Sequence, residues 1–241
     1  MNKKSTILEV EDLIIGYKNK ELVRSINVSG SAGQFILLVG ANGKGKSTLL
    51  KTLMGHLAPI AGKVRLKGED LADLSLTTIA QTVAFLSGNT HLPSSVTVND
   101  LLQFSRIPYQ SGVRGIRAED RKVIRQVVDE MGIDDFLEKP YMSLSDGQKQ
   151  LINIARSLVQ QTPIILLDEP TAHLDVVNKR TVFQLLKDQT EKGKLIVCCS
   201  HDLAEGSLFA DEVWLINKAD NFEVVEMYKE ITTSDLESRL F

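Results

Sequence analysis

The segment FILLVGANGKGKST occupies residues 35–48 of this chain and combines an apolar run with a glycine-rich loop. Its first five residues are apolar, as expected for a strand that is buried on both faces of a sheet. Residues 40–47 then fit the pattern G-x-x-x-x-G-K-[ST], and after Thr48 an apolar helical run follows at Leu49 to Leu53. A strand, a glycine-rich loop and a helix in this order predict a phosphate-binding loop.

The residue types in this loop suit a nucleotide phosphate. Glycines let the backbone curl closely around an anion, because a Cβ would block its approach. Lys46 would bring a positive charge to the terminal phosphates, and the Ser47 hydroxyl would complete the oxygen shell of Mg²⁺. We expect ATP to be bound by Gly40, Ala41, Asn42, Gly43, Lys44, Gly45, Lys46, Ser47 and Thr48. A glycine-rich turn without a ligand is the alternative, and Lys44 also fits a solvated surface lysine.

A second motif places two carboxylates at the end of another apolar run. Ile164 to Leu167 lead directly into Asp168 and Glu169. At the carboxyl end of a parallel strand beside the phosphate loop, Asp168 would hold Mg²⁺ together with Ser47. Glu169 would orient or deprotonate the attacking water. Alone, such an acidic strand end would be read as a cap or turn.

Short apolar runs alternate with longer helical patterns, which predicts an α/β fold built around a mostly parallel sheet. Leu8 to Ile15 and Val23 to Val28 instead predict an antiparallel β portion at the start of the chain. We expect one domain over residues 1–241. Residues 1–88 and 162–241 would form a P-loop NTPase (RecA-like) core that includes the antiparallel portion, and residues 89–161 an inserted α-helical subdomain.

Two helices of the insertion can be placed from local signals. Thr97 to Asp100 has the form of a capping box that opens a helix. Ala118 to Met131 predicts a second helix, which Gly132 would end. Its apolar face is expected to consist of Val123, Val127, Val128 and Met131. Pro108 to Gly115 predicts a loop between the two helices.

Composition excludes several classes of protein. The 241 residues are 43% hydrophobic and 24% charged, close to the averages of globular proteins. A net charge of -3 gives no basic footprint for a nucleic-acid partner. The two adjacent cysteines, Cys198 and Cys199, cannot connect distant parts of the fold, which favours a reducing cytoplasm. We expect neither a signal peptide nor a membrane-spanning helix.

Leu144-Ser145-Asp146-Gly147-Gln148 precedes another helical run. Ser145 and Gln148 have the spacing of a capping box, and the free N–H groups of such a helix start attract anions. A plain helix cap is the alternative. The segment resembles the L-S-G-G-Q signature of ABC ATPases. The order of the motifs fits that family as well: phosphate loop, signature, Asp168-Glu169-Pro170-Thr171, Leu174-Asp175 and Ser200-His201-Asp202.

The resemblance covers essentially the whole chain and implies a composite ATP site. In this family ATP is sandwiched between two copies, so the signature of one copy would complete the site of the other through Ser145, Asp146, Gly147 and Gln148. Asp175 matches the D-loop that crosses the dimer interface. His201 matches the switch histidine that contacts the γ-phosphate, which makes Glu169 and His201 the expected catalytic pair. Tyr17 would stack on adenine, although as a lone tyrosine after a strand it also fits ordinary packing.

Two positions depart from the family pattern. Asp146 replaces the first glycine of the signature, and because a carboxylate repels phosphate we expect it to face away from the nucleotide. Gly88 stands at the Q-loop position, where the family usually has a glutamine. Gln81 lies too early and Asn89 one residue too late to supply the missing amide.

The resemblance implies a transporter motor, made of a second copy of this chain and separate transmembrane permease subunits. Residues 162–175 are similar to ATPases that serve iron-siderophore, haem and cobalamin importers. Such a subunit is cytoplasmic and peripheral on the inner face of the cell membrane. A soluble ABC ATPase of iron-sulfur cluster assembly is the alternative. A nucleotide sensor without hydrolysis is disfavoured by Glu169 and His201.

We predict that the missing amide at position 88 slows turnover or loosens its coupling to transport. The variant Gly88→Gln should therefore raise the ATPase rate or the transport obtained per ATP. Steady-state ATPase and transport assays would measure both quantities. If neither changes, the Q-loop departure has no functional weight.

Overall fold

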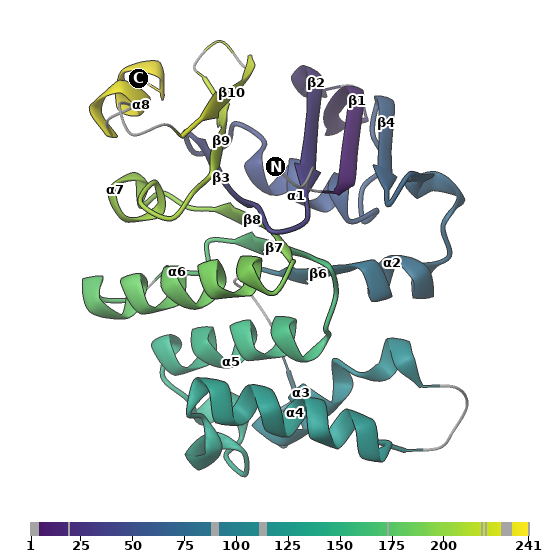
Figure 1. Ribbon diagram of the computed structural model, residues 1–241, viewed down its shortest axis with the longest axis vertical. Coiled ribbons are helices and arrows are strands. Elements are labelled where there is room, and N and C mark those ends of the chain that lie inside the picture. The colour runs from purple at the N-terminus through teal and green to yellow at the C-terminus, as the bar shows by residue number, and fades with distance from the viewer. Residues whose placement is uncertain are drawn as a thin grey trace.

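A computed structural model gives the fold and describes residues 5–18, 20–87, 92–110, 115–172, 174–217, 219, 221–227 and 233–240. Its main sheet has six strands (Figure 1). In spatial order they are β10 (Phe222–Glu226), β9 (Glu212–Ile216), β3 (Phe35–Gly40), β8 (Leu195–Cys199), β7 (Ile164–Asp168) and β6 (Val83–Leu86). All neighbours pair in parallel except β10, which is antiparallel to β9. This arrangement confirms the predicted α/β class.

The central strands are buried along almost their whole length. Every residue of β3 and β8 is buried, and only the last residue of β7 is partly exposed. Parallel strands of this kind need cover on both faces, which explains their continuous apolar sequences. Because β3, β8 and β7 are neighbours in parallel register, their carboxyl ends meet at one edge of the sheet.

A second sheet is antiparallel and has four strands in the order β2-β1-β4-β5. They are β1 (Thr6–Tyr17), β2 (Lys20–Ser31), β4 (Ala61–Leu66) and β5 (Glu69–Asp70). The antiparallel β portion is thus present, with longer strands than the sequence predicts. Apolar residues of this sheet pack with α1 (Lys46–Leu53) and one face of the main sheet in a shared core.

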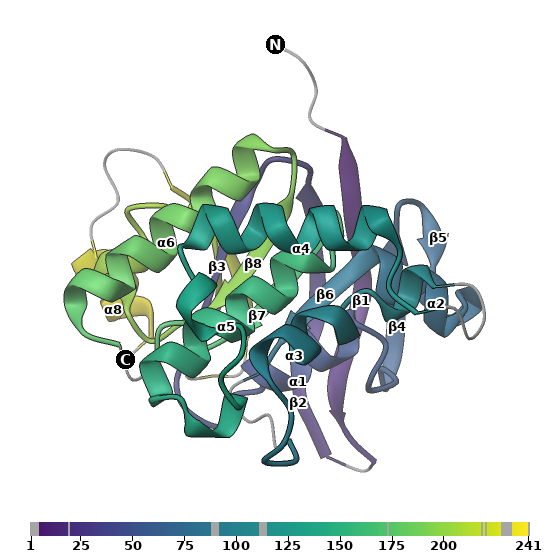
Figure 2. The same ribbon diagram turned by 90° about the horizontal axis from the view of Figure 1, so that it is seen from below.

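Helices cover the other face of the main sheet. Contacts join α5 (Asp146–Val159) to β6 and α6 (Val176–Glu191) to β8, while α3 (Val98–Phe104) and α4 (Ala118–Met131) pack on α5, farther from the sheet (Figures 1 and 2). The other helices are α2 (Leu76–Thr82), α7 (Leu203–Gly206) and α8 (Thr233–Leu240), with 3-10 turns at Leu71–Asp73, Ile107–Tyr109, Asp134–Phe136 and Tyr141–Ser143. Within the described part of the chain, no helix has the length and apolar character needed to cross a bilayer.

The local helix signals are mostly confirmed. The Thr97 hydroxyl accepts a hydrogen bond from the Asp100 N–H at 3.1 Å, and an Asp100 carboxylate oxygen accepts one from the Thr97 N–H at 3.0 Å. Helix α4 ends at Gly132 with a φ of 62°. Its apolar face is centred differently from the prediction: Ile124 is buried with Val127 and Val128, whereas Val123 and Met131 are half-buried.

The loop predicted over Pro108 to Gly115 is only partly irregular. Pro108 lies in the short 3-10 turn Ile107–Tyr109. Residues 111–114 lie outside the described residues.

A buried ion pair joins two helical segments of the insertion. The Arg106 Nε lies 2.7 Å from Asp120 Oδ1, and both residues are buried. The same guanidinium donates to the Val159 carbonyl at 2.9 Å and lies 4.1 Å from the centroid of the Tyr109 ring. Arg106 therefore holds the start of α4, the end of α5 and the turn after α3 together, while its charge is compensated by Asp120.

Removing one partner of this pair should be costly. We predict that Asp120→Ala lowers the free energy of unfolding by about 3–5 kcal/mol, because it leaves a buried guanidinium without its counter-charge. Urea denaturation measures this. The matched control is Arg125→Ala, which breaks exposed pairs with Asp129 and Asp134 and should cost less than about 1 kcal/mol. Equal effects of the two variants would show that burial of the pair is unimportant.

Candidate nucleotide site

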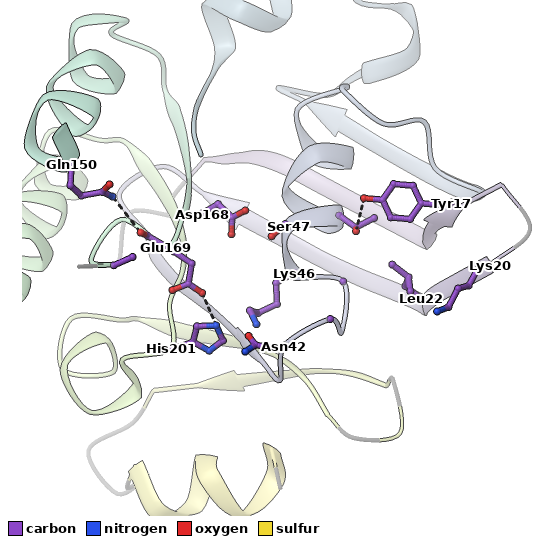
Figure 3. Close-up of a pocket in the computed structure, with 14 residues that line it drawn as sticks. Tyr17, Lys20, Leu22, Asn42, Lys46, Ser47, Gln150, Asp168, Glu169 and His201 are labelled. Carbon is purple, nitrogen blue, oxygen red and sulfur yellow. Dashed lines mark hydrogen bonds and ion pairs between the residues drawn. The ribbon is translucent and has the colours of Figure 1, made fainter. Parts of the chain in front are cut away.

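The carboxyl ends of β3, β7 and β8 open onto a cavity of about 780 Å³. Figure 3 shows Lys46 and Ser47 between Tyr17 on one side and Glu169 and Gln150 on the other. The lining residues are Tyr17, Lys20, Leu22, Asn42, Gly43, Gly45, Lys46, Ser47, Thr48, Gln150, Asp168, Glu169, Ala172 and His201. The structure thus gathers in one place the side chains that the sequence assigned to phosphate binding and hydrolysis.

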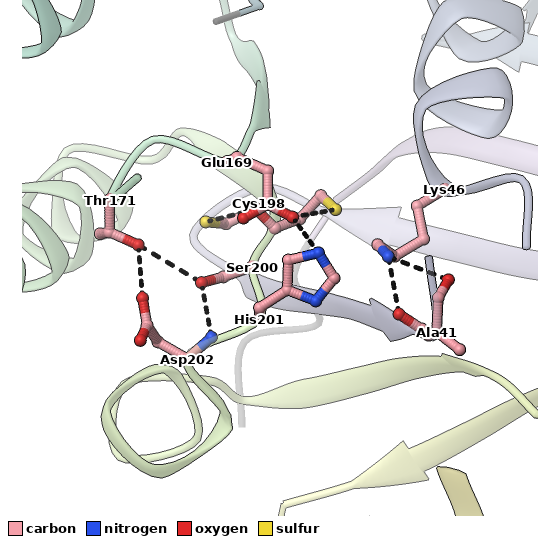
Figure 4. Close-up of polar contacts among 10 residues, drawn as sticks. Ala41, Lys46, Glu169, Thr171, Cys198, Ser200, His201 and Asp202 are labelled. Atoms are coloured by element: carbon pink, nitrogen blue, oxygen red, sulfur yellow. Dashed lines mark hydrogen bonds and ion pairs between the residues drawn. The ribbon is translucent and has the colours of Figure 1, made fainter. Parts of the chain in front are cut away.

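The phosphate loop connects β3 to α1. Gly43 and Gly45 have φ values of 78° and 102°, in the left-handed region where only glycine is free of strain. The buried Lys46 donates from Nζ to the carbonyl oxygens of Gly40 at 2.6 Å and Ala41 at 3.2 Å (Figure 4). Its ammonium group is therefore fixed inside the curve of the loop, at the start of a helix whose free N–H groups favour an anion.

Not every residue of the predicted loop set reaches the cavity. Gly40, Ala41 and Lys44 are absent from its lining, whereas Asn42, Ser47 and Thr48 belong to it. Gly40 and Ala41 instead orient Lys46 through their carbonyl groups.

An aromatic and apolar wall lies at the other end of the cavity. Tyr17 is the last residue of β1, and 51% of its surface is exposed. Its hydroxyl accepts a hydrogen bond from the Thr48 hydroxyl at 3.3 Å, which fixes the ring beside the phosphate loop. Together with Leu22 it offers a surface on which a planar base can stack.

The acidic side of the site is made by the turn after β7. Glu169 has a φ of 57°, an uncommon left-handed conformation for a side-chain-bearing residue. Its N–H donates to the Cys199 carbonyl at 3.0 Å, so the turn is attached to the neighbouring strand β8. The Glu169 Oε1 lies 2.9 Å from His201 Nε2 (Figure 4). The two residues predicted to be catalytic are therefore in direct contact.

The environment of Glu169 makes its carboxylate a better proton acceptor. Burial is the main effect and raises the pKa of its carboxyl, and the charge of Asp168 acts in the same direction. His201 and Lys46 oppose this by lowering that pKa, so the net result is a rise. A carboxylate whose pKa is raised takes up a proton more readily from water.

A network of polar side chains holds the loop that carries His201. Thr171 donates from Oγ1 to Asp202 Oδ2 at 3.0 Å, and Lys179 donates to Asp202 Oδ1 at 2.9 Å. The Asp202 N–H donates to the Ser200 hydroxyl at 3.1 Å (Figure 4). The residues on both sides of His201 are thereby anchored to the turn after β7 and to α6.

The signature residues cap α5 as the sequence indicates. The Ser145 Oγ accepts from the Gln148 N–H at 3.3 Å, and the Gln148 amide oxygen accepts from the Ser145 N–H at 3.0 Å. The side chain of Asp146 is 76% exposed and its carboxylate lies 3.7 Å from Lys149 Nζ. Neither these residues nor Gly147 line the cavity of their own chain, as far as the described residues define it.

Asp175, the predicted D-loop residue, does not line the cavity. Asp175 caps α6 by accepting from the Asn178 N–H at 2.9 Å. Gly88, with Asn89 beside it, lies outside the described residues, so the Q-loop prediction has no structural counterpart.

Several residues of the site were not predicted. Gln150 lines the cavity from α5, and Lys20 and Leu22 line it from β2. Lys179, on α6, donates a hydrogen bond to Asp202 in the loop that carries His201. Gln150 carries no sequence signal of its own beyond its place two residues after the signature, because a helix pattern does not say which neighbour a polar side chain meets.

The donor set of the cavity fits a hard cation. The Ser47 hydroxyl and the Asp168 carboxylate both line it, and oxygen ligands are what Mg²⁺ prefers. Mg²⁺ usually takes only one or two ligands from the protein and the rest from phosphate and water. Two oxygen-bearing side chains beside a phosphate loop therefore match the need of a nucleotide-bound cation.

Known proteins share both the sequence and the fold. The family model described as "ABC transporter" matches residues 23–172. The iron(3+)-hydroxamate import ATP-binding protein FhuC of Bacillus subtilis (strain 168) is 37% identical over 88% of this chain and 79% of that protein. The ferric enterobactin transport ATP-binding protein FepC of Escherichia coli (strain K12) is 32% identical over 97% of this chain and 86% of that protein.

A solved structure agrees with these relatives. It is described as an inward-facing conformation of a suspected metal-chelate type ABC transporter, and one of its chains has a TM-score of 0.83 at 28% identity, over 98% of this chain and 89% of that chain. The matched residues include the phosphate loop and the acidic turn of the cavity. The chain belongs to the ABC transporter family, in which it is the ATP-binding and ATP-hydrolysing subunit.

Proposed function

We propose that this chain powers an importer of iron-siderophore, haem or cobalamin. The observation that carries the ATPase mechanism is the convergence of Lys46, Asp168, Glu169 and His201 on one cavity. The class of cargo is supported by the relatives named for iron(3+)-hydroxamate import and ferric enterobactin transport. Among the three cargo classes, these names favour iron-siderophore complexes.

In the proposed site ATP lies along the cavity with its adenine on Tyr17. Its phosphates receive the N–H groups of the phosphate loop and of the start of α1. Lys46 then exchanges its contacts with the Gly40 and Ala41 carbonyls for phosphate oxygens. Ser47 and Asp168 would hold Mg²⁺, which when bound supplies positive charge to the phosphates.

Hydrolysis in this site uses Glu169 as the base. The carboxylate takes a proton from a water molecule while the water oxygen forms a bond to the γ-phosphorus. The bond from that phosphorus to the bridging oxygen breaks, which yields ADP and phosphate. His201 lies 2.9 Å from the same carboxylate, which supports a role in orienting Glu169. In the proposed site it would also contact the γ-phosphate.

The proposed site is completed by a second copy of the chain. The anion-attracting helix start at Ser145 to Gln148 does not line its own cavity but is exposed at Ser145 and Asp146. In a nucleotide sandwich it would face the ATP held by the partner copy. The charge of Asp146 is partly balanced by Lys149 in this geometry, which reduces its repulsion of a phosphate.

The proposed motor acts on separate transmembrane permease subunits from the inner face of the cell membrane. A soluble role in iron-sulfur cluster assembly is the second candidate, since it would use the same ATPase core. The import relatives favour the permease.

Replacing the base should trap the closed dimer. We predict that Glu169→Gln lowers the hydrolysis rate by about 10²–10⁴-fold, because the amide cannot accept the proton. With ATP and Mg²⁺ the variant should elute as a dimer in size-exclusion chromatography. Glu119→Gln, at an exposed position on α4, is the control and should hydrolyse ATP normally. A Glu169→Gln protein that stays monomeric with ATP and Mg²⁺ would refute the composite site.

The partner and the cargo can be identified together. The tagged chain should co-purify from membranes with a polytopic helical protein, and the reconstituted complex should accumulate a ferric siderophore in vesicles only when ATP is supplied. Haem and cobalamin are tested in the same vesicles to decide between cargo classes. Recovery in a soluble iron-sulfur assembly complex would reject the importer.

A further inference from the structure

Gln150 connects the signature helix to the catalytic turn of the same chain. Its Nε2 donates a hydrogen bond to the carbonyl oxygen of Glu169 at 3.3 Å (Figure 3). The residue is only 7% exposed, although it lines the nucleotide cavity. Because Gln150 belongs to α5, this hydrogen bond links the helix directly to the turn after β7.

The Glu169 backbone depends on a small number of hydrogen bonds. Its φ of 57° is unfavourable for a glutamate and persists only where surrounding contacts hold it. Those contacts are its N–H bond to the Cys199 carbonyl and two bonds that its own carbonyl accepts, from the Ala172 N–H at 3.2 Å and from Gln150. Among the described residues, Gln150 is the one from the helical insertion that makes such a bond.

Helix α5 contains both the signature residues at its start and Gln150. Helix α5 begins at Asp146, directly after the cap Ser145, and Gln150 lies within its second turn. An α-helix is stiff over so short a distance, so a displacement of its first turn also displaces the Gln150 amide. Whatever holds the signature in place therefore holds the carbonyl of Glu169.

We propose that Gln150 is a positioning residue through which nucleotide bound against the signature sets the orientation of Glu169 in the same chain. This inference rests on the nucleotide-sandwich dimer proposed above. In that dimer the signature contacts the ATP held by the partner copy, while Glu169 serves the ATP held by its own copy. Occupation of one site then prepares the base of the other, and hydrolysis becomes positively cooperative in ATP.

The test compares two glutamines: Gln150 within α5 and Gln160, the C-cap residue of that helix. Gln150→Met keeps the length and the burial of the side chain but removes the N–H donor. Gln160→Met is the matched control, because Gln160 also donates from Nε2 to a backbone carbonyl, that of Ala80 at 2.6 Å, away from the cavity. Gln150→Leu, which is also uncharged and lacks the N–H donor, serves if the methionine variant does not fold.

ATPase rates are measured over a range of ATP concentrations for the full chain. We expect Gln150→Met to lower kcat by about 10-fold through misplacement of the base. KM should stay within about twofold, and the Hill coefficient should fall to about 1. Gln160→Met should leave kcat and the Hill coefficient unchanged. A purely structural role would lower Tm and raise KM in both variants alike.

The outcomes separate this inference from the proposed function. If Glu169→Gln forms the ATP-bound dimer but Gln150→Met keeps the kcat and Hill coefficient of the parent, the role of Gln150 is rejected and the dimer stands. If Glu169→Gln fails to dimerise with ATP and Mg²⁺, the sandwich is rejected, and the inference with it.

Discussion

Strands β3, β8 and β7 pair in parallel register, and this pairing positions the functional loops of the chain. The three strands are far apart in sequence but end at the same edge of one sheet. Each is followed there by a loop that carries different functional side chains. The phosphate loop follows β3, the acidic turn with Glu169 follows β7, and the loop with His201 follows β8. A slip of one residue between these strands would turn their side chains to opposite faces and separate Glu169 from His201. The continuous burial of the strands makes such a slip costly.

Much of this arrangement could be predicted because its signals are local. A loop that must curl around phosphate needs glycine at fixed positions, and Gly43 and Gly45 adopt the left-handed conformations that this requires. The start of a helix is likewise determined by residues that are close in sequence, as the capping boxes at Thr97 and Ser145 show. The apolar run before Asp168 marks a buried strand without any knowledge of its neighbours.

The parts that escaped prediction are those decided by tertiary packing. Strand β4 contains only two buried residues, Val64 and Leu66, in an otherwise polar stretch, and becomes a strand because β1 pairs with it. Strand β10 is an edge strand with one buried residue. The partners of Gln150 and Lys179 depend on where α5 and α6 come to lie, and no spacing rule in the sequence fixes that. The Q-loop position at Gly88 lies outside the described residues.

The resting position of Lys46 has a consequence for the cycle of a motor. Its ammonium group is hydrogen-bonded to two carbonyls of the loop, and these bonds stabilise the curve of the loop. In the proposed site a bound phosphate would compete with these carbonyls for the ammonium group, so the affinity for ATP would include the cost of breaking the two hydrogen bonds. Such an exchange of contacts would favour release of the products after hydrolysis. This suits an ATPase that must release ADP and phosphate in every cycle.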